Sequence, residues 1–129
     1  MILNLDFNSE KPIYLQMKDE MIKAIAKGDL KINESLPSVR AMAEEIGINL
    51  HTVNKAYNLL KDEGYINIDR RKGAIINILP LDRKEEEQNK IQEEVELLVA
   101  KSYLKGIKEE EFLAICSSYY KQYGVKKYE

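Results

Sequence analysis

Apolar residues recur at intervals of three and four in the first part of the chain, which predicts amphipathic helices. A first helix is expected over residues 12–27, with Pro12 in its first turn and one face turned inward: Tyr14, Met17, Met21 and Ile25. Ser38 suits the N-cap of a second helix that ends at Gly47 and buries Val39, Met42, Ala43 and Ile46. Residues 30–37, between these helices, are expected to form a short turn.

A third helix has two unlike faces. It begins at a capping Asn49 and runs to about Glu63, and its inner face holds Val53, Ala56, Tyr57 and Leu60. Its outer face carries short or hydrogen-bonding side chains: His51, Asn54, Lys55 and Asn58. A helix that reads base edges in the major groove needs both faces, because one docks on the protein core while the other meets the DNA.

Two β-rich runs follow the third helix, at residues 65–69 and 74–79. The residues between them are Arg70, Arg71, Lys72 and Gly73. This pattern predicts a hairpin with a charged tip. Three helices followed by such a hairpin form a winged helix-turn-helix.

The composition shifts to Glu, Lys and Gln from Arg83 onward. A helix through about Leu104 places Ile91, Val95 and Leu98 at helical spacing, and a last helix over 109–123 aligns Phe112, Ile115, Tyr119 and Tyr123. The expected fold class is therefore mostly α with a small β-hairpin wing. Residues 1–80 are expected to form a winged helix-turn-helix DNA-binding domain, and residues 81–129 a two-helix dimerisation tail.

The amino-acid composition excludes several classes of protein. The 129 residues are 44% hydrophobic and 33% charged, which suits a globular chain, and the single Cys116 excludes an internal disulfide or a thiolate-rich zinc site. No apolar run approaches the roughly 20 residues of a membrane span, so a cytoplasmic protein is expected. A net charge of −2 and a pI of about 5.6 weigh against nucleic-acid binding, although the basic triplet 70–72 lies apart from the acidic segment after Asp82.

Six short motifs fall where the helices and turns are expected: Pro12-Ile13-Tyr14, Gly28-Asp29-Leu30, Leu36-Pro37-Ser38-Val39-Arg40, Gly47-Ile48-Asn49, Thr52-Val53-Asn54-Lys55-Ala56-Tyr57 and Glu63-Gly64-Tyr65-Ile66. Together they resemble the GntR family of bacterial transcription regulators over about residues 8–79. The short two-helix tail is similar to that of the YtrA-like branch, whose members lack a large effector domain and dimerise through such a tail.

The resemblance implies that DNA is contacted by the start of the second helix, the first turns of the third helix and the wing tip. The implied DNA-binding residues are Ser38, Arg40, Asn49, His51, Thr52, Asn54, Lys55, Arg71, Lys72 and Gly73. Two departures concern this surface. Leu50 stands where relatives often carry a polar or arginine side chain, and Ala74-Ile75-Ile76 replaces a frequent Thr-Phe-Val.

The expected function is a sequence-specific transcription regulator, most simply a repressor, that binds a pseudo-palindromic double-stranded DNA operator as a homodimer. The dimer interface is expected to use Ile91, Val95, Leu98, Phe112, Ile115 and Tyr119. No cofactor, metal or membrane is expected, and an unidentified small-molecule effector remains a candidate partner. One alternative stays open, a winged-helix protein-interaction module without specific DNA binding. No enzymatic activity is expected, because the sequence shows no nucleophile–base pairing and no Gly-rich phosphate loop, and the aminotransferase-like GntR relatives need a long C-terminal extension.

Several residues of the sequence also have alternative interpretations. Arg40 can be a surface residue in an intramolecular ion pair, and the triplet 70–72 can serve only to solubilise an exposed hairpin edge. Cys116 can be an inert buried residue or a redox sensor. The aromatic stripe of Tyr119, Tyr120 and Tyr123 can be dimer packing or a ligand cage.

Overall fold

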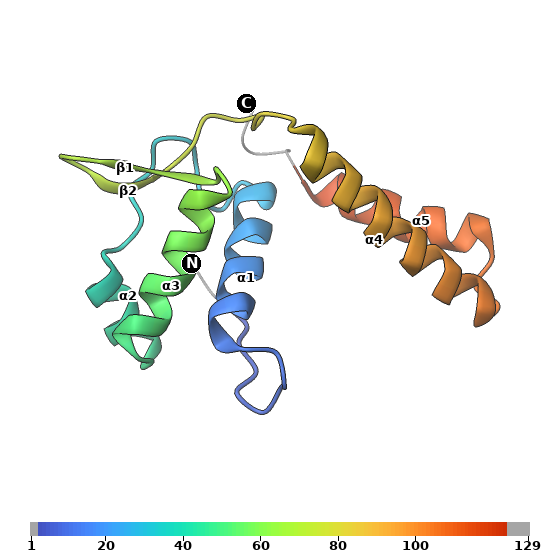
Figure 1. Ribbon diagram of the computed structural model, residues 1–129, viewed down its shortest axis with the longest axis horizontal. Coiled ribbons are helices and arrows are strands. Elements are labelled where there is room, and N and C mark those ends of the chain that lie inside the picture. Colours follow the sequence, from blue (N-terminus) through green and yellow to red (C-terminus); the bar gives the residue numbers. More distant parts are fainter. Residues whose placement is uncertain (1–2, 124–129) are drawn as a thin grey trace. The chain divides into compact units, whose positions relative to one another are not determined.

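The computed structural model describes residues 3–123 (Figure 1). The described chain divides into two compact units, a winged unit that ends at Leu81 and a tail unit that begins at Asp82. Residues 124–129 of the predicted tail lie outside the described residues.

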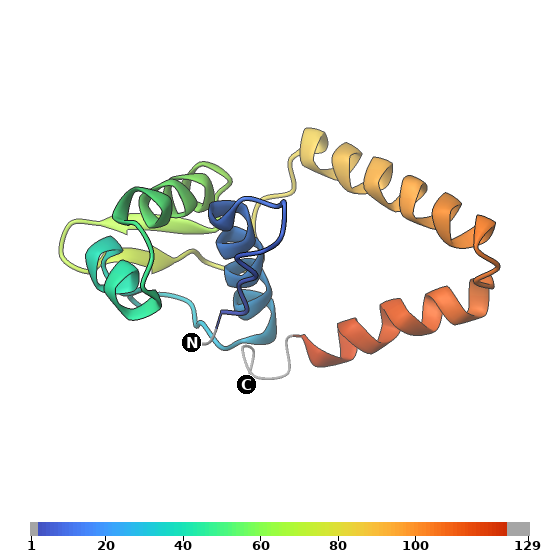
Figure 2. The same cartoon turned by 90° about the horizontal axis from the view of Figure 1, so that it is seen from below.

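The winged unit contains three helices and a two-stranded antiparallel sheet: α1 (Ile13–Lys27), α2 (Val39–Ile46), α3 (Leu50–Asp62), β1 (Ile66–Asp69) and β2 (Gly73–Ile76). Helix α3 packs against both α1 and α2 and leads into the hairpin, whose tip lies on the same side of the unit as α2 (Figure 1 and Figure 2). This arrangement confirms the winged helix-turn-helix fold. The hairpin differs only in extent, since β2 begins at Gly73 and ends at Ile76.

The predicted caps at Ser38 and Asn49 form, and the predicted inner faces of α1, α2 and α3 pack on the core, although Tyr14, Val39 and Ile46 are only half-buried there. The Ser38 hydroxyl accepts a hydrogen bond from the Ala41 amide at 3.0 Å, and the Asn49 side chain accepts one from the His51 amide at 2.7 Å. Each bond satisfies an amide that the first turn leaves unpaired. The core is built around fully or almost fully buried side chains from all three helices and the hairpin: Met17, Met21, Met42, Val53, Leu60, Ile66 and Ile76.

The prediction of a short turn over residues 30–37 is wrong for the second half of this segment, which runs alongside the hairpin. Ser35 forms an antiparallel bridge with Ile75. The Leu36 amide donates to the Ala74 carbonyl at 2.8 Å, and the Ile76 amide donates to the Glu34 carbonyl at 3.2 Å. The edge of β2 therefore finds its hydrogen-bond partners in a polar segment that has no strand signal in its sequence.

The segment before α1 is held against that helix by a buried glutamine. The Gln16 side-chain oxygen accepts from the Asp6 amide at 2.8 Å. Its nitrogen donates to the carbonyls of Asp6 and Lys11 at 3.0 and 2.7 Å. These bonds fix residues 6–11 and so set where α1 begins.

The tail unit consists of α4 (Glu85–Leu104) and α5 (Glu109–Gln122). Within residues 82–123 only Ser102 is buried, with its hydroxyl donating to the Leu98 carbonyl at 2.8 Å. Large apolar side chains are exposed along both helices: Ile91, Val95, Leu97, Leu98, Val99, Tyr103, Leu104, Leu113, Ile115, Tyr119 and Tyr120. This unit alone therefore buries almost no apolar core.

Candidate nucleic-acid interface

A cleft of about 300 Å³ lies between the start of α2, the exposed face of α3 and the hairpin. It is lined by Leu36, Pro37, Ser38, Val39, Asn54, Tyr57, Asn58, Ile68, Lys72, Gly73 and Ala74. The lining is mostly apolar, and it includes no carboxylate. The cleft thus brings together the three elements from which DNA contacts were expected.

The segment that enters α2 holds these three elements in a fixed relation. The Leu36 amide donates to the Ala74 carbonyl in the hairpin, at 2.8 Å. The Tyr57 hydroxyl of α3 donates to the Pro37 carbonyl, also at 2.8 Å. Because Ser38 then caps α2 itself, residues 36–38 connect the hairpin, α3 and the start of α2 through short hydrogen bonds.

Tyr57 is the buried member of this connection, with 5% of its surface exposed. Burial, together with the negative charge of Glu45, raises the pKa of Tyr57 to about 12. The phenol therefore stays protonated at neutral pH and remains available as a donor to Pro37.

Replacing Tyr57 with Phe should lower the free energy of unfolding by about 1 to 3 kcal/mol, because the Pro37 carbonyl loses its partner in a half-buried site. Urea unfolding followed by circular dichroism measures the loss. Tyr103→Phe is the matched control, since Tyr103 is 73% exposed in the tail unit. Equal stability of the two variants would show that the Tyr57 hydroxyl does not hold α2 in place.

The first turns of α3 present two kinds of side chain. His51 and Asn54 are exposed, and Thr52 is half-buried beside them. The Asn49 side-chain oxygen, by contrast, accepts the hydrogen bond that caps the helix. The Lys55 ammonium lies 4.0 Å from the centre of the Tyr14 ring, a cation–π contact that directs this side chain toward α1.

The hairpin tip is shaped by an aspartate. The Asp69 carboxylate accepts hydrogen bonds from the amides of Lys72, at 2.9 Å, and Arg71, at 2.8 Å. These two backbone bonds, with the charge of Lys72, hold the pKa of Asp69 below its usual range. Gly73 follows with φ at +77°, a conformation that a side chain would strain.

Asp69 should consequently titrate below 3.8, its ordinary pKa. The hairpin tip is fully ordered above pH 3.8, the ordinary pKa of an aspartate. It loses this order as the pH falls through the lowered pKa of Asp69, because protonation removes the charged acceptor. Carbon-detected NMR of the Asp69 carboxyl measures the midpoint, and the amide protons of Arg71 and Lys72 should follow the same curve. A midpoint at or above 3.8 would contradict this role.

The cations of the candidate interface take no part in the ion pairs found among residues 3–123. Among residues 3–123, ion pairs join Lys11 to Asp19, Lys18 to Glu63 and Lys23 to Glu20. None involves Arg40, Arg71 or Lys72, and all three side chains are exposed. The interpretation of Arg40 as half of an intramolecular ion pair is therefore not supported within the described residues.

Four of the ten predicted DNA-binding residues line the cleft: Ser38, Asn54, Lys72 and Gly73. Arg40 and Arg71 belong to the elements that bound it, Asn49 caps α3, and His51, Thr52 and Lys55 lie elsewhere on that helix. Two exposed lining residues, Asn58 and Ile68, were missed as site candidates. Asn58 had a signal in the sequence, since it shares the outer face of α3 with Asn54, whereas Ile68 had none because apolar strand residues are usually core.

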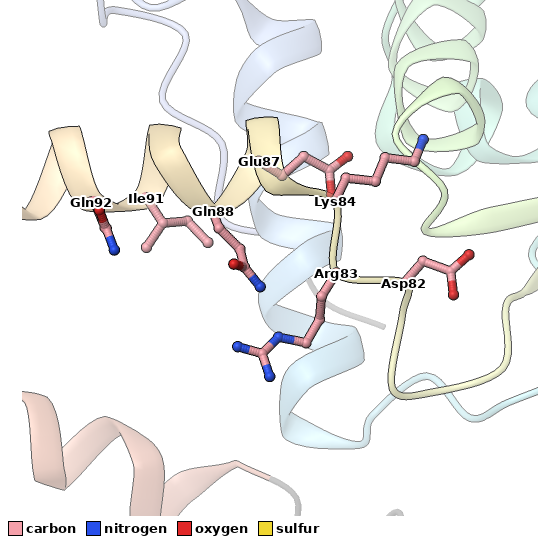
Figure 3. Close-up of a pocket in the computed structure, with 7 residues that line it drawn as sticks. All are labelled: Asp82, Arg83, Lys84, Glu87, Gln88, Ile91 and Gln92. Atoms are coloured by element: carbon pink, nitrogen blue, oxygen red, sulfur yellow. The ribbon is translucent and has the colours of Figure 1, made fainter.

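A second hollow, of about 370 Å³, lies at the start of α4 and is lined by Asp82, Arg83, Lys84, Glu87, Gln88, Ile91 and Gln92 (Figure 3). All of these residues come from one short stretch of chain, and charges of both signs face it. Among residues 3–123, no group of three or more His, Cys, Asp and Glu side chains is placed to hold a metal ion. No helix among the described residues has the length and apolar character to span a membrane.

Three helices, a hairpin wing and a cleft without carboxylates between them define a winged helix-turn-helix protein of the kind found in transcription regulators. Residues 13–76 match the family model described as bacterial regulatory proteins, gntR family. YtrA from Sulfolobus acidocaldarius, a GntR-family transcription factor of known structure, is 36% identical, with a TM-score of 0.62 over 76% of this chain and 99% of its own. The chain belongs to the GntR family.

Two further comparisons extend this result. Over 76 residues the chain is 40% identical to the HTH-type transcriptional repressor YtrA of Bacillus subtilis strain 168, a match covering 59% of this chain and 58% of that repressor. A transcriptional antiterminator from Listeria monocytogenes EGD-e has a similar fold, with a TM-score of 0.87 and 24% identity in a match that covers 100% of this chain and 98% of its own. The family and the Bacillus repressor are transcription regulators and not enzymes.

Proposed function

We propose that this protein represses transcription as a homodimer bound to a pseudo-palindromic DNA operator. Residues 1–80 bind DNA, and residues 81–129 pair two protomers. The repressor role follows the name of the Bacillus relative, of whose length the match covers little more than half. A regulator of this kind acts in the cytoplasm, where the bacterial genome lies, and a small-molecule effector that releases the DNA remains part of the proposal.

The observation that carries DNA binding is the gathering of exposed cations and hydrogen-bonding side chains at the start of α2, the start of α3 and the hairpin tip. Helix α3 enters the major groove, where His51, Thr52 and Asn54 meet base edges and Lys55 meets the backbone, while Asn49 orders the first turn. Ser38 and Arg40 meet a phosphate or a guanine edge. Arg71, Lys72 and Gly73 approach the minor groove.

The apolar surface of the tail unit supports pairing with a second copy. Helices α4 and α5 expose Ile91, Val95, Leu98, Ile115 and Tyr119, each by about half of its surface, and Phe112 on α5 is half-buried. Exposed apolar surface of this extent is typical of an interface between subunits. A two-fold dimer would set two α3 helices about one duplex turn apart, which explains why the operator should be two-fold.

Selection from a library of duplexes with randomised sequence tests this function. The purified protein should enrich a two-fold motif whose half-sites are separated by about 10 base pairs. Analytical ultracentrifugation of the free protein should give the mass of a dimer. A motif that lacks two-fold symmetry would contradict the dimeric mechanism. Failure to enrich any motif would favour a protein-interaction module, an alternative that gains some weight from equal numbers of basic and acidic side chains in residues 3–81.

A further inference from the structure

Ile68 is an apolar side chain that the core of the winged unit leaves largely exposed. It follows Ile66 by two residues in β1, so both side chains project from the same face of the hairpin. Ile66 is fully buried against the core, whereas Ile68 is 62% exposed. The inner face of the hairpin therefore continues past the edge of the core, and its apolar side chain there is mostly exposed to solvent.

The surroundings of Ile68 identify the kind of molecule that would cover it. Its cross-strand neighbour is Ala74, whose small side chain leaves the cleft open beside it. Asn54 and Asn58 face the same cleft from successive turns of α3, and Ser38 and Lys72 stand at its other sides. An apolar patch bordered by amides, a hydroxyl and an ammonium, without any carboxylate, suits a ligand that alternates apolar and anionic groups.

A strand of duplex DNA is such a ligand, because each nucleotide joins an apolar deoxyribose face to a phosphate. A helix in the major groove and a wing in the adjacent minor groove are always separated by the one sugar–phosphate strand that divides these grooves. The cleft between α3 and the hairpin is the space that this strand would occupy. This step rests on the proposed function, since it requires α3 and the hairpin tip to enter neighbouring grooves.

We propose that the cleft holds one DNA backbone strand, with a deoxyribose packed on Ile68 and the flanking phosphates bound by Lys72 and by the start of α2 at Ser38. Ile68 is thereby a DNA-binding residue that carries no charge and reads no base. Its contact adds affinity on every sequence, because all nucleotides share the sugar. It also leaves the salt dependence unchanged, because no counterion is released when an apolar side chain binds.

Two isoleucines of similar exposure provide a matched test. Ile68→Ala removes the proposed contact, whereas Ile78→Ala alters a side chain that is 69% exposed but does not line the cleft. The binding constant of each variant is measured by fluorescence anisotropy on two duplexes of 30 base pairs, over a range of salt concentrations. One duplex carries the site enriched from the randomised library, and the other carries a scrambled sequence.

Ile68→Ala should weaken binding about fivefold on both duplexes, the effect of losing part of a buried aliphatic side chain. The slope of log affinity against log salt should stay that of the wild type, while Lys72→Ala should reduce the slope by about 1. Ile78→Ala should bind as the wild type does. Thermal unfolding of both isoleucine variants should match the wild type, since neither side chain belongs to the core.

Three results would overturn the inference while leaving the proposed function intact: a loss confined to the enriched duplex, a change of salt slope in Ile68→Ala, or equal affinities of the two isoleucine variants. The first would place Ile68 against a base, and the last would leave the cleft empty of DNA. A wild-type protein that binds the two duplexes equally, or neither, would instead refute the proposed function.

Discussion

A protein with Leu98→Glu and Ile115→Glu should be monomeric and should bind its operator about 10²- to 10⁴-fold more weakly than the wild type. The two side chains are 52% and 46% exposed in the tail unit, one on each helix. In the proposed dimer both are buried, and burying a carboxylate without a partner is prohibitive. Without the dimer, each winged unit binds a half-site independently. The affinity gained when two linked units bind both half-sites at once is then lost.

Leu104→Glu is the matched control for this pair of substitutions. Leu104 is 85% exposed on α4 and lies six residues from Leu98, about 120° around the helix. This variant should remain a dimer and retain operator affinity. Sedimentation equilibrium and titration of the enriched duplex measure both properties. A doubly substituted protein that still sediments as a dimer would place the interface elsewhere.

Arg40→Ala should weaken binding to the operator by about 1 to 3 kcal/mol, or roughly 5- to 150-fold, with little effect on a scrambled duplex. Arg40 is the second residue of α2, exposed and outside the ion pairs of the described residues, so its guanidinium is available for a guanine edge. Lys72→Ala should weaken binding on both duplexes alike, because an ammonium at the hairpin tip meets phosphate.

Lys61→Ala serves as the control for both variants, since Lys61 is exposed in the last turn of α3, away from the residues that line the cleft. Its affinity should match that of the wild type on each duplex. Titrations at several salt concentrations separate base recognition from charge. Equal losses for Arg40→Ala on the operator and on the scrambled duplex would assign Arg40 to the backbone instead.

The helices, their caps and their inner faces could be predicted because local chemistry determines them. Ser38 and Asn49 have oxygen atoms that reach the amides of a first turn, and this depends only on residues two or three positions away. The inner face of α3 followed equally well from apolar spacing, and Val53, Ala56, Tyr57 and Leu60 are all buried.

The features that were missed depend on neighbours distant in the sequence. Ser35 is polar and carries no strand signal, and its pairing with Ile75 exists only because the hairpin returns beside it. The contact of the Lys55 ammonium with the Tyr14 ring exists only because α3 packs on α1. Ile68 belongs to an apolar strand pattern, and only the position of the core edge shows that it is uncovered.

The proposed function requires that the winged unit, with equal numbers of basic and acidic side chains in residues 3–81, recognises a DNA sequence through specific contacts and not through charge alone. The ratio of affinities for the enriched and scrambled duplexes, measured as salt rises from 50 to 200 mM, tests it most directly. Both affinities should fall as the salt concentration rises, while the protein keeps a preference of about 10³-fold or more for the enriched duplex. Affinities that fall together to the same value, with no preference at any salt concentration, would contradict it.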